Sequence, residues 1–305
     1  MKPQASLSLD LDNLWSYLKI HGDAEWERYP SYLDRVVPRI TAFLAERRLR
    51  ITVFVVGADA ARAQNRESLA ELGAAGHEIG NHSFHHEPWI AHASEAGAYD
   101  ELARAHDAIA SATGREPHGF RGPGFATSPA LLGALARMRY RYDASRLPTF
   151  IGPLARWYYF RNADLTQQQR RERRALFGSW RDVLARNTAH SLQTAHGRLA
   201  SIPVTTMPGA RVPIHFSYLH YLERYNRALA ERYFATALSL CRLTGTAPSL
   251  LLHPLDFLGC NDISELRFFP GMDVPGAQKL RSTSRYLSMV TDRFDVVPVE
   301  MHPCA

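Results

Sequence analysis

The chain has 305 residues, a length that suits either one α/β barrel or two smaller domains. Hydrophobic residues make up 46% of it and charged residues 22%, proportions of an ordinary folded protein that exclude disordered and collagen-like classes. The formal charge of +6 is only a weak bias towards anionic partners, and the three cysteines are too few and too far apart for a disulfide framework or a zinc finger.

Short apolar segments alternate with longer amphipathic segments along the chain, which is the pattern of βα units around a parallel sheet or barrel. We predict strands at Ser6–Leu11, Ile51–Val56, Glu78–Asn81, near Phe120, and at Leu199–Val204, Ser249–His253 and Asp295–Val299. We predict helices at Tyr32–Glu46, Arg66–Ala75, Glu95–Thr113, Pro129–Arg137, Tyr218–Leu243 and Pro275–Arg293. The expected fold is a distorted (β/α) barrel of about seven strands, forming one domain over residues 1–305.

Residues 145–198 interrupt this alternation and are expected to form a helical or loop insertion. The segment contains the aromatic run Trp157–Phe160, followed between Arg161 and Arg186 by seven arginines against three acidic residues, a net charge of 7 − 3 = +4. A solvated insertion that only caps the barrel explains this pattern, and so does a lid that contacts an anionic substrate.

The amino-terminal sequence MKPQASLSLDLDNLW holds acidic residues where a signal peptide needs an apolar core. No run of about 18 apolar residues follows anywhere in the chain. We therefore expect a protein without a transmembrane segment, located in the cytoplasm or bound at the inner surface of the membrane.

The first predicted strand alternates leucines with Ser8, Asp10 and Asp12, so two carboxylates share one face at its carboxyl end. Active sites of βα barrels lie at the carboxyl ends of the strands. A solvent-facing edge strand would show the same alternation, so this pattern alone favours neither explanation.

Four histidines occur between residues 77 and 86, on either side of the third predicted strand. The spacing of His82 and His86 brings two imidazoles to one side of a turn, and Asp12 would complete a two-histidine, one-carboxylate metal set. Such a set leaves an open position for water on a zinc ion. His77 and His85 also fit structural or surface roles, and we assign neither to the site.

Two further polar residues follow predicted strands. Glycine and proline around Arg121 fix a tight turn, and a guanidinium there can pair with a carboxylate and keep it ionised. The apolar run at residues 250–252 ends at His253, and Pro254 stops the strand, so His253 lies at the same rim. A surface turn and a buried structural histidine are the alternatives for these two residues.

Taken together and in this order, these elements resemble the polysaccharide deacetylase family, carbohydrate esterase family 4, with its NodB-type domain. The resemblance extends over most of the chain. It rests on L-D-L-D-N at residues 9–13 where the family usually has T-F-D-D-G, on His82, Ser83 and His86, on Arg121 and Pro123, and on Leu251 and His253. The family's fourth motif, built around an Asp and a Trp, is matched by residues 142–145, which contain no Trp.

The resemblance implies a metal-dependent hydrolase that removes the acyl group of an N-acylated sugar or of a sugar-containing precursor. One divalent ion is implied on Asp12, His82 and His86, with zinc as the first choice and cobalt, manganese, nickel or iron as alternatives. The metal would polarise the amide carbonyl and activate the attacking water.

The resemblance also implies roles for the remaining motif residues. Asp10 matches the general base, Arg121 would keep Asp10 anionic, and His253 would protonate the leaving nitrogen. The expected substrate contacts are Pro123, Gly124 and Trp157. Asp143 and Asp256 are both candidates for orienting the His253 ring.

Other classes of function compete with this interpretation. A related amidase or deformylase acting on a small amide, a ureide or an N-formyl sugar would use the same metal site, and a different cleft size would separate the two. A non-catalytic carbohydrate-binding protein is expected to have lost one of the acids or histidines, and this chain retains all five. The arginine-rich segment alone suggests a nucleic acid, but no nucleic-acid module is present, so we expect a phosphate- or lipid-linked sugar as the partner instead.

Overall fold

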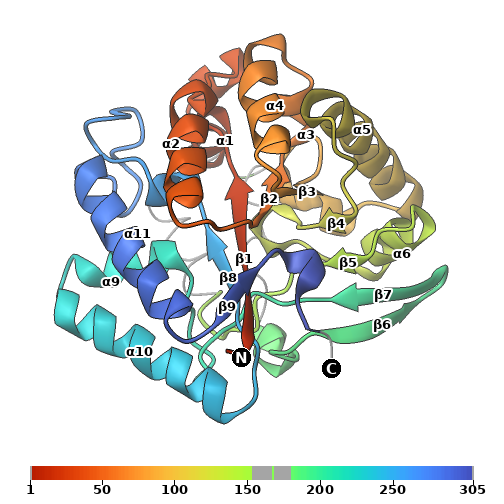
Figure 1. Cartoon of the computed structure of the whole chain (residues 1–305). Helices are drawn as coiled ribbons and strands as arrows, with labels where there is room; N and C mark the ends of the chain where they lie inside the picture. The colour runs from red at the N-terminus through yellow and green to blue at the C-terminus, as the bar shows by residue number, and fades with distance from the viewer. Residues whose placement is uncertain (1, 153–166, 168–179, 304–305) are drawn as a thin grey trace.

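The computed structural model describes residues 2–152, 167 and 180–303 (Figure 1). The strands of these residues are β1 (Gln4–Leu11), β2 (Thr52–Val55), β3 (Glu78–Asn81), β4 (Gly119–Phe120), β5 (Tyr142–Asp143), β6 (His190–Thr194), β7 (Gly197–Ser201), β8 (Ser249–Leu252) and β9 (Asp295–Val297). They form one sheet in the order β6-β7-β5-β4-β3-β2-β1-β8, and β9 also pairs with β1. All of these pairings are parallel except the β6-β7 hairpin.

Helices surround the sheet and cover its outer face (Figure 1). They are α1 (Leu14–His21), α2 (Leu33–Glu46), α3 (Gly57–Ala60), α4 (Arg66–Ala74), α5 (Glu95–Thr113), α6 (Pro129–Arg137), α9 (Phe216–Glu223), α10 (Arg227–Leu243) and α11 (Gly276–Thr291). In α2 the buried side chains recur at helical spacing: Leu33, Val36, Val37, Ile40 and Leu44. This apolar stripe packs against the sheet and explains why the segment is a helix. No helix of the described residues is both long and apolar enough to cross a membrane.

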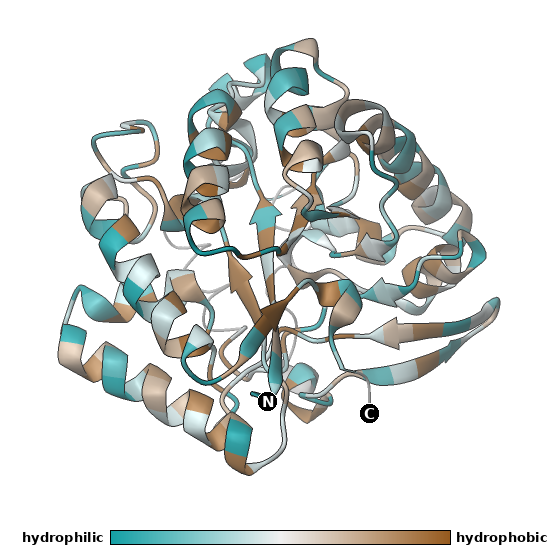
Figure 2. Ribbon diagram, viewed as in Figure 1, coloured by the Kyte–Doolittle hydropathy of each residue, from teal (hydrophilic) through white to brown (hydrophobic). Residues whose placement is uncertain are grey.

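The strand β1 pairs with three strands, β2, β8 and β9. Its leucines, Leu7, Leu9 and Leu11, belong to the main hydrophobic core, while Ser8 and Asp10 are buried on the other face. Hydrophobic residues follow the central strands in Figure 2, whereas the carboxyl end of β1 is hydrophilic. The core therefore holds β1 rigidly and presents its polar end at the rim of the sheet.

The predicted distorted (β/α) barrel is confirmed, but the described residues form nine strands where about seven are expected, and α1 lies where no helix is predicted. The strands β5 and β6 were not predicted, and β6 lies inside the segment expected to be an insertion. The helix predicted at Tyr218–Leu243 is two helices, α9 and α10, because α10 begins anew at the capping side chain of Asn226. Trp157 and most of the basic segment Arg161–Arg186 lie outside the described residues.

The short 3₁₀ helix η8 (Val299–Met301) closes the amino-terminal end of the sheet. The backbone N–H of Val299 donates to Thr52 Oγ1 at 2.6 Å, at the first residue of β2. His302, which follows η8 and is buried, shares a hydrogen bond of 2.8 Å between its Nδ1 and Ser6 Oγ on β1. The end of the described chain is thus tied to the opposite edge of the strands from the polar rim.

This closure predicts a dependence of stability on pH. Burial lowers the pKa of His302 to about 4, below the value near 6.5 of a histidine in an unfolded chain. The unfolded state therefore binds more protons below pH 6.5, and the stabilisation is complete above that pH and is lost as the pH falls towards 4. When the pH is lowered from 7 to 5, the free energy of unfolding should fall in both proteins. The fall should be about 1–2 kcal/mol smaller in His302→Asn than in the wild type, as measured by urea titration at each pH. Identical pH dependence of the two proteins would contradict this.

Candidate active site

The predicted site residues come together at one edge of the sheet. Asp10 lies at the carboxyl end of β1, and Asp12 lies just beyond it. His82 directly follows β3, Arg121 follows β4, and His253 follows β8. Since these strands are parallel neighbours, their carboxyl ends meet, and five residues far apart in sequence share one rim.

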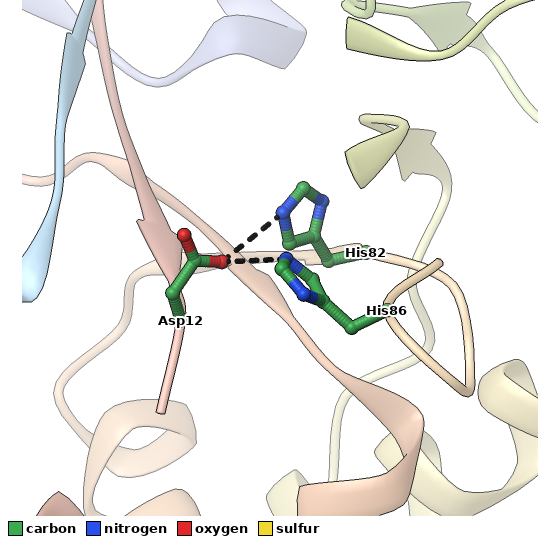
Figure 3. Close-up of side chains that lie close together, drawn as sticks. All are labelled: Asp12, His82 and His86. Atoms are coloured by element: carbon green, nitrogen blue, oxygen red, sulfur yellow. Dashed lines mark ion pairs between the residues drawn. The ribbon is translucent and has the colours of Figure 1, made fainter. Parts of the chain in front are cut away.

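Asp12, His82 and His86 form a tight buried cluster (Figure 3). Asp12 Oδ1 lies 2.9 Å from His86 Nε2 and 3.4 Å from His82 Nε2. All three side chains can offer one ligand atom within 4.8 Å of the others. The separations of 2.9 and 3.4 Å suit ligand atoms that share one small divalent cation.

The hydrogen bonding of His82 shows that this cluster suits a cation. His82 Nδ1 lies 2.6 Å from the carbonyl oxygen of Arg121, which can only accept, so Nδ1 carries a proton. In the neutral ring the lone pair of Nε2 then faces the carboxylate of Asp12. Two facing acceptors are stable only with a proton or a metal ion between them, so the donor set fits a divalent metal.

The pKa values in the cluster have the same physical origin. Burial alone would raise the pKa of Asp12. The charge of His86 and hydrogen bonds with both histidines outweigh burial and hold this pKa well below its usual range. Burial likewise acts against protonation of His82, yet the negative charges of Asp10 and Asp12 raise its pKa. The cluster is a buried region of negative potential that attracts positive charge.

The loop after β3 folds back so that both histidine rings point to Asp12. Ser83 and His86 adopt left-handed backbone conformations, with φ of 62° and 53°, which non-glycine residues rarely do. The Asn81 side chain accepts the Ser83 N–H at 2.9 Å, and Ser83 Oγ accepts the His86 N–H at 3.2 Å. These bonds compensate the strained backbone and fix the spacing of the two histidines.

A buried carboxylate on α5, that of Glu101, stabilises the same loop by accepting hydrogen bonds from it. Glu101 accepts the backbone N–H groups of Phe84 and His85 at 3.0 and 2.7 Å, and pairs with His85 Nδ1 at 2.7 Å. His85 therefore supports the loop and faces away from the metal cluster. His77 lies at the opposite end of β3, where its ring accepts the Ile51 N–H at 3.4 Å.

Arg121 is completely buried and pairs with Asp10, as predicted. Its Nη1 lies 3.2 Å from Asp10 Oδ1, and its Nη2 donates to Ser8 Oγ at 3.1 Å. The guanidinium also lies over the ring of Phe54, 4.7 Å from its centre. A buried cation needs such partners, so Arg121 and Asp10 fix each other's orientation on the rim.

The turn after Arg121 depends on Gly122 and is supported by Asp143. A Cβ at Gly122 would lie 2.1 Å from the carbonyl oxygen of Ala126, so the position admits only glycine. The Gly122 N–H donates to Ser145 Oγ at 2.8 Å, and Ser145 in turn hydrogen-bonds Asp143. Asp143 thus supports the Arg121 turn, and burial raises its pKa to about 6. Pro123 and Gly124 form the same turn (η4, Pro123–Phe125), with Gly124 at φ 58°.

Of the two acids considered for orienting His253, Asp256 is the one that contacts it. Asp256 Oδ2 accepts the backbone N–H of His253 at 2.8 Å. The ring of His253 is reached by Ser217, and the ring of His215 lies 6.4 Å away, centre to centre. The motifs gave no indication of Ser217 or His215, since both come from the start of α9 and approach only through tertiary packing.

Tyr17 on α1 is a further residue that the motifs did not indicate. Burial, followed by the negative charge of Asp12 and of more distant acids including Asp256 and Asp10, raises its pKa well above the usual value. The phenol therefore stays neutral and can donate a hydrogen bond into a region rich in carboxylates.

Comparisons with known proteins agree with this geometry. Residues 24–142 match the family model of polysaccharide deacetylases. The resemblance to the polysaccharide deacetylase family is confirmed. The match includes His82, His86 and Arg121, and it supports a hydrolase that removes acetyl groups from an acetylated carbohydrate. No curated protein matches the chain.

One solved structure of a protein assigned to the polysaccharide deacetylases shares the fold. A Mycobacterium smegmatis protein assigned to these enzymes is 18% identical, with 97% of this chain and 91% of that chain covered and a TM-score of 0.56. A family 4 carbohydrate esterase from Streptomyces lividans, solved with acetate, is 22% identical over 52% of this chain and 72% of that chain, with a TM-score of 0.38. A family 4 pseudoenzyme from Bacillus anthracis is 10% identical over 98% of this chain and 66% of that chain, with a TM-score of 0.47.

Proposed function

We propose that this protein is a metal-dependent deacetylase that hydrolyses the amide bond of an N-acylated sugar. The observation that carries the proposal is the buried cluster of Asp12, His82 and His86, whose acceptor atoms converge beside the Asp10–Arg121 pair. A divalent ion on these three residues would polarise the amide carbonyl and lower the pKa of a water molecule from about 15.7 towards 7.

Asp10 and His253 would transfer protons in the reaction. Asp10, oriented by Arg121 through Oδ1, keeps its second carboxylate oxygen available to accept a proton from the attacking water. His253 follows the strand next to β1, in which Leu252 is the register partner of Leu9. The proposed base Asp10 and the proposed acid His253 therefore each come one residue further along neighbouring strands. Donation from His253 to the departing nitrogen is required because an unprotonated amine anion is a very poor leaving group.

For the substrate we propose a phosphate-linked or lipid-linked sugar amide. The proposal rests on the sequence of the segment between Arg161 and Arg186, whose net charge of +4 suits charge-assisted hydrogen bonds to a phosphate. Trp157, together with Pro123 and Gly124 of the Arg121 turn, would contact the sugar.

Metal analysis followed by a substrate screen tests the function. The screen offers N-acetylated and N-formylated sugars, each in a neutral and a phosphorylated form, at low and high salt. We expect acetate release from sugar amides by the wild type and none by Asp10→Asn, with faster turnover of the phosphorylated form that fades as salt increases. Formate release alone would favour the deformylase alternative, and equal rates for both forms at every ionic strength would refute the anionic substrate.

A further inference from the structure

The His253 ring is linked to a buried carboxylate through a serine. Ser217 Oγ lies 3.1 Å from His253 Nδ1 and donates to Asp256 Oδ1 at 2.8 Å. Asp256 is buried on the 3₁₀ helix η7 (Pro254–Asp256), directly after His253. Since Ser217 comes from α9, the link joins two separate elements of the fold.

The directions of these hydrogen bonds fix the tautomer of the ring. A carboxylate only accepts, so the single hydroxyl proton of Ser217 points to Asp256, and Ser217 Oγ must accept from His253 Nδ1. The backbone N–H of Asp256 faces the His253 side chain in a capping box, but its hydrogen bond runs to the carbonyl oxygen of His253, at 2.9 Å. His253 therefore carries its proton on Nδ1, which leaves Nε2 to face the rim.

The second oxygen of Asp256 holds the backbone at the same place. Oδ2 accepts the His253 N–H at 2.8 Å, while the carbonyl oxygen of Asp256 accepts from Thr283 Oγ1 on α11 at 2.9 Å. The buried carboxylate of Asp256 therefore holds both the ring of His253, through Ser217, and its backbone N–H, directly.

Other groups around His253 do not compete for this role. Burial, followed by the charges of His253 and Arg121, lowers the pKa of His215 to about 3, so His215 carries no charge at neutral pH. Asp10 and Arg121 lie across the rim and pair with each other. Asp256 accordingly supplies the negative charge on the Nδ1 side of the ring.

We propose that Ser217 is a positioning residue that relays the carboxylate of Asp256 to His253. In the neutral ring it keeps the proton on Nδ1, so that Nε2 is the nitrogen that takes up the second proton and, in the protonated ring, donates it to the leaving nitrogen. The effect on turnover rests on the proposed function, whereas the tautomer itself does not.

Ser217→Ala, Ser217→Thr, Asp256→Asn and the double variant of Ser217→Ala with Asp256→Asn test the relay. Ser282→Ala is the matched control, because Ser282 Oγ also donates to a carboxylate of α9, Glu223, at 2.9 Å, but does not contact His253. Metal content, kcat and KM are measured for each protein. Nitrogen-15 NMR of the histidine rings, assigned with His253→Gln, reports the tautomer without any substrate.

We expect Ser217→Ala to lower kcat about 10- to 100-fold with an unchanged metal content and little change in KM, the usual size of effect when the support of a catalytic group is lost. Ser217→Thr should restore the rate, and the double variant should be no slower than Asp256→Asn, because the two residues act as a unit. The NMR spectrum should show the Nδ1–H form of His253 in the wild type and in Ser282→Ala, and its loss in Ser217→Ala.

An Nε2–H tautomer in the wild type would overturn the relay, as would a Ser217→Ala protein with the wild-type tautomer and rate. If the tautomer changes as expected while no sugar amide is hydrolysed by any variant, the relay stands and the proposed function fails. The two conclusions are therefore tested separately.

Discussion

Replacing His86 with alanine should remove the bound metal and abolish hydrolysis together. His86 Nε2 makes the shorter contact to Asp12, 2.9 Å, so its loss leaves at most two ligands in the cluster. Three protein ligands are the usual minimum for a catalytic zinc site, and we expect the content to fall from about one ion per chain to nearly none. Elemental analysis of the dialysed protein, alongside the acetate assay, measures both quantities.

The matched control for this experiment is His92→Ala, which removes an exposed histidine six residues further along the chain. It should keep both metal and activity. The double variant of His82 and His86 provides the strictest test, because full metal occupancy in that protein would exclude the cluster as the metal site.

Asp10→Asn should keep the metal and lose most of the turnover. The asparagine side chain has nearly the same shape and can still accept from Arg121, but it cannot take a proton from water at neutral pH. A general base typically contributes about 10²- to 10⁴-fold, so kcat should fall within that range. Asp12→Asn serves as the contrast, since it should lose metal as well as rate. A near-normal kcat in Asp10→Asn would remove Asp10 from the mechanism.

The fold could be predicted wherever buried apolar residues repeat at a fixed period. The helices Glu95–Thr113 and Pro129–Arg137 have the predicted bounds, because each buries a stripe of apolar side chains. The strand at residues 78–81 also has the predicted bounds, although Ile79 is its one apolar side chain besides Gly80. The strand β6 could not be predicted because its sequence, HSLQT, is mostly polar. It pairs only with β7 at the edge of the sheet, so the hydrogen bonds of that hairpin, and no apolar face, determine its structure.

The site could be predicted to the extent that its residues follow strands. Topology forces the carboxyl ends of parallel strands together, so polar residues at those ends, such as Asp10 and His253, meet without further information. Ser217 could not be found in this way. It is an ordinary serine within a helix, and its approach to His253 is decided by how α9 packs on β8.

The pairing of β1 with late strands has a consequence for how the protein folds during synthesis. Ser6 to Leu9 pair with Ser249 to Leu252, and Gln4 pairs with Asp295, so one edge of the first strand finds its partners only after about 240 further residues have been made. At about 5–20 residues per second this edge stays open for roughly 10 to 50 s on the ribosome. An open strand edge can pair with the wrong strand, so we expect the nascent amino-terminal half to bind chaperones. Because Asp10 lies on this strand and His253 follows its late partner, these two residues can meet only after residue 253 has been made.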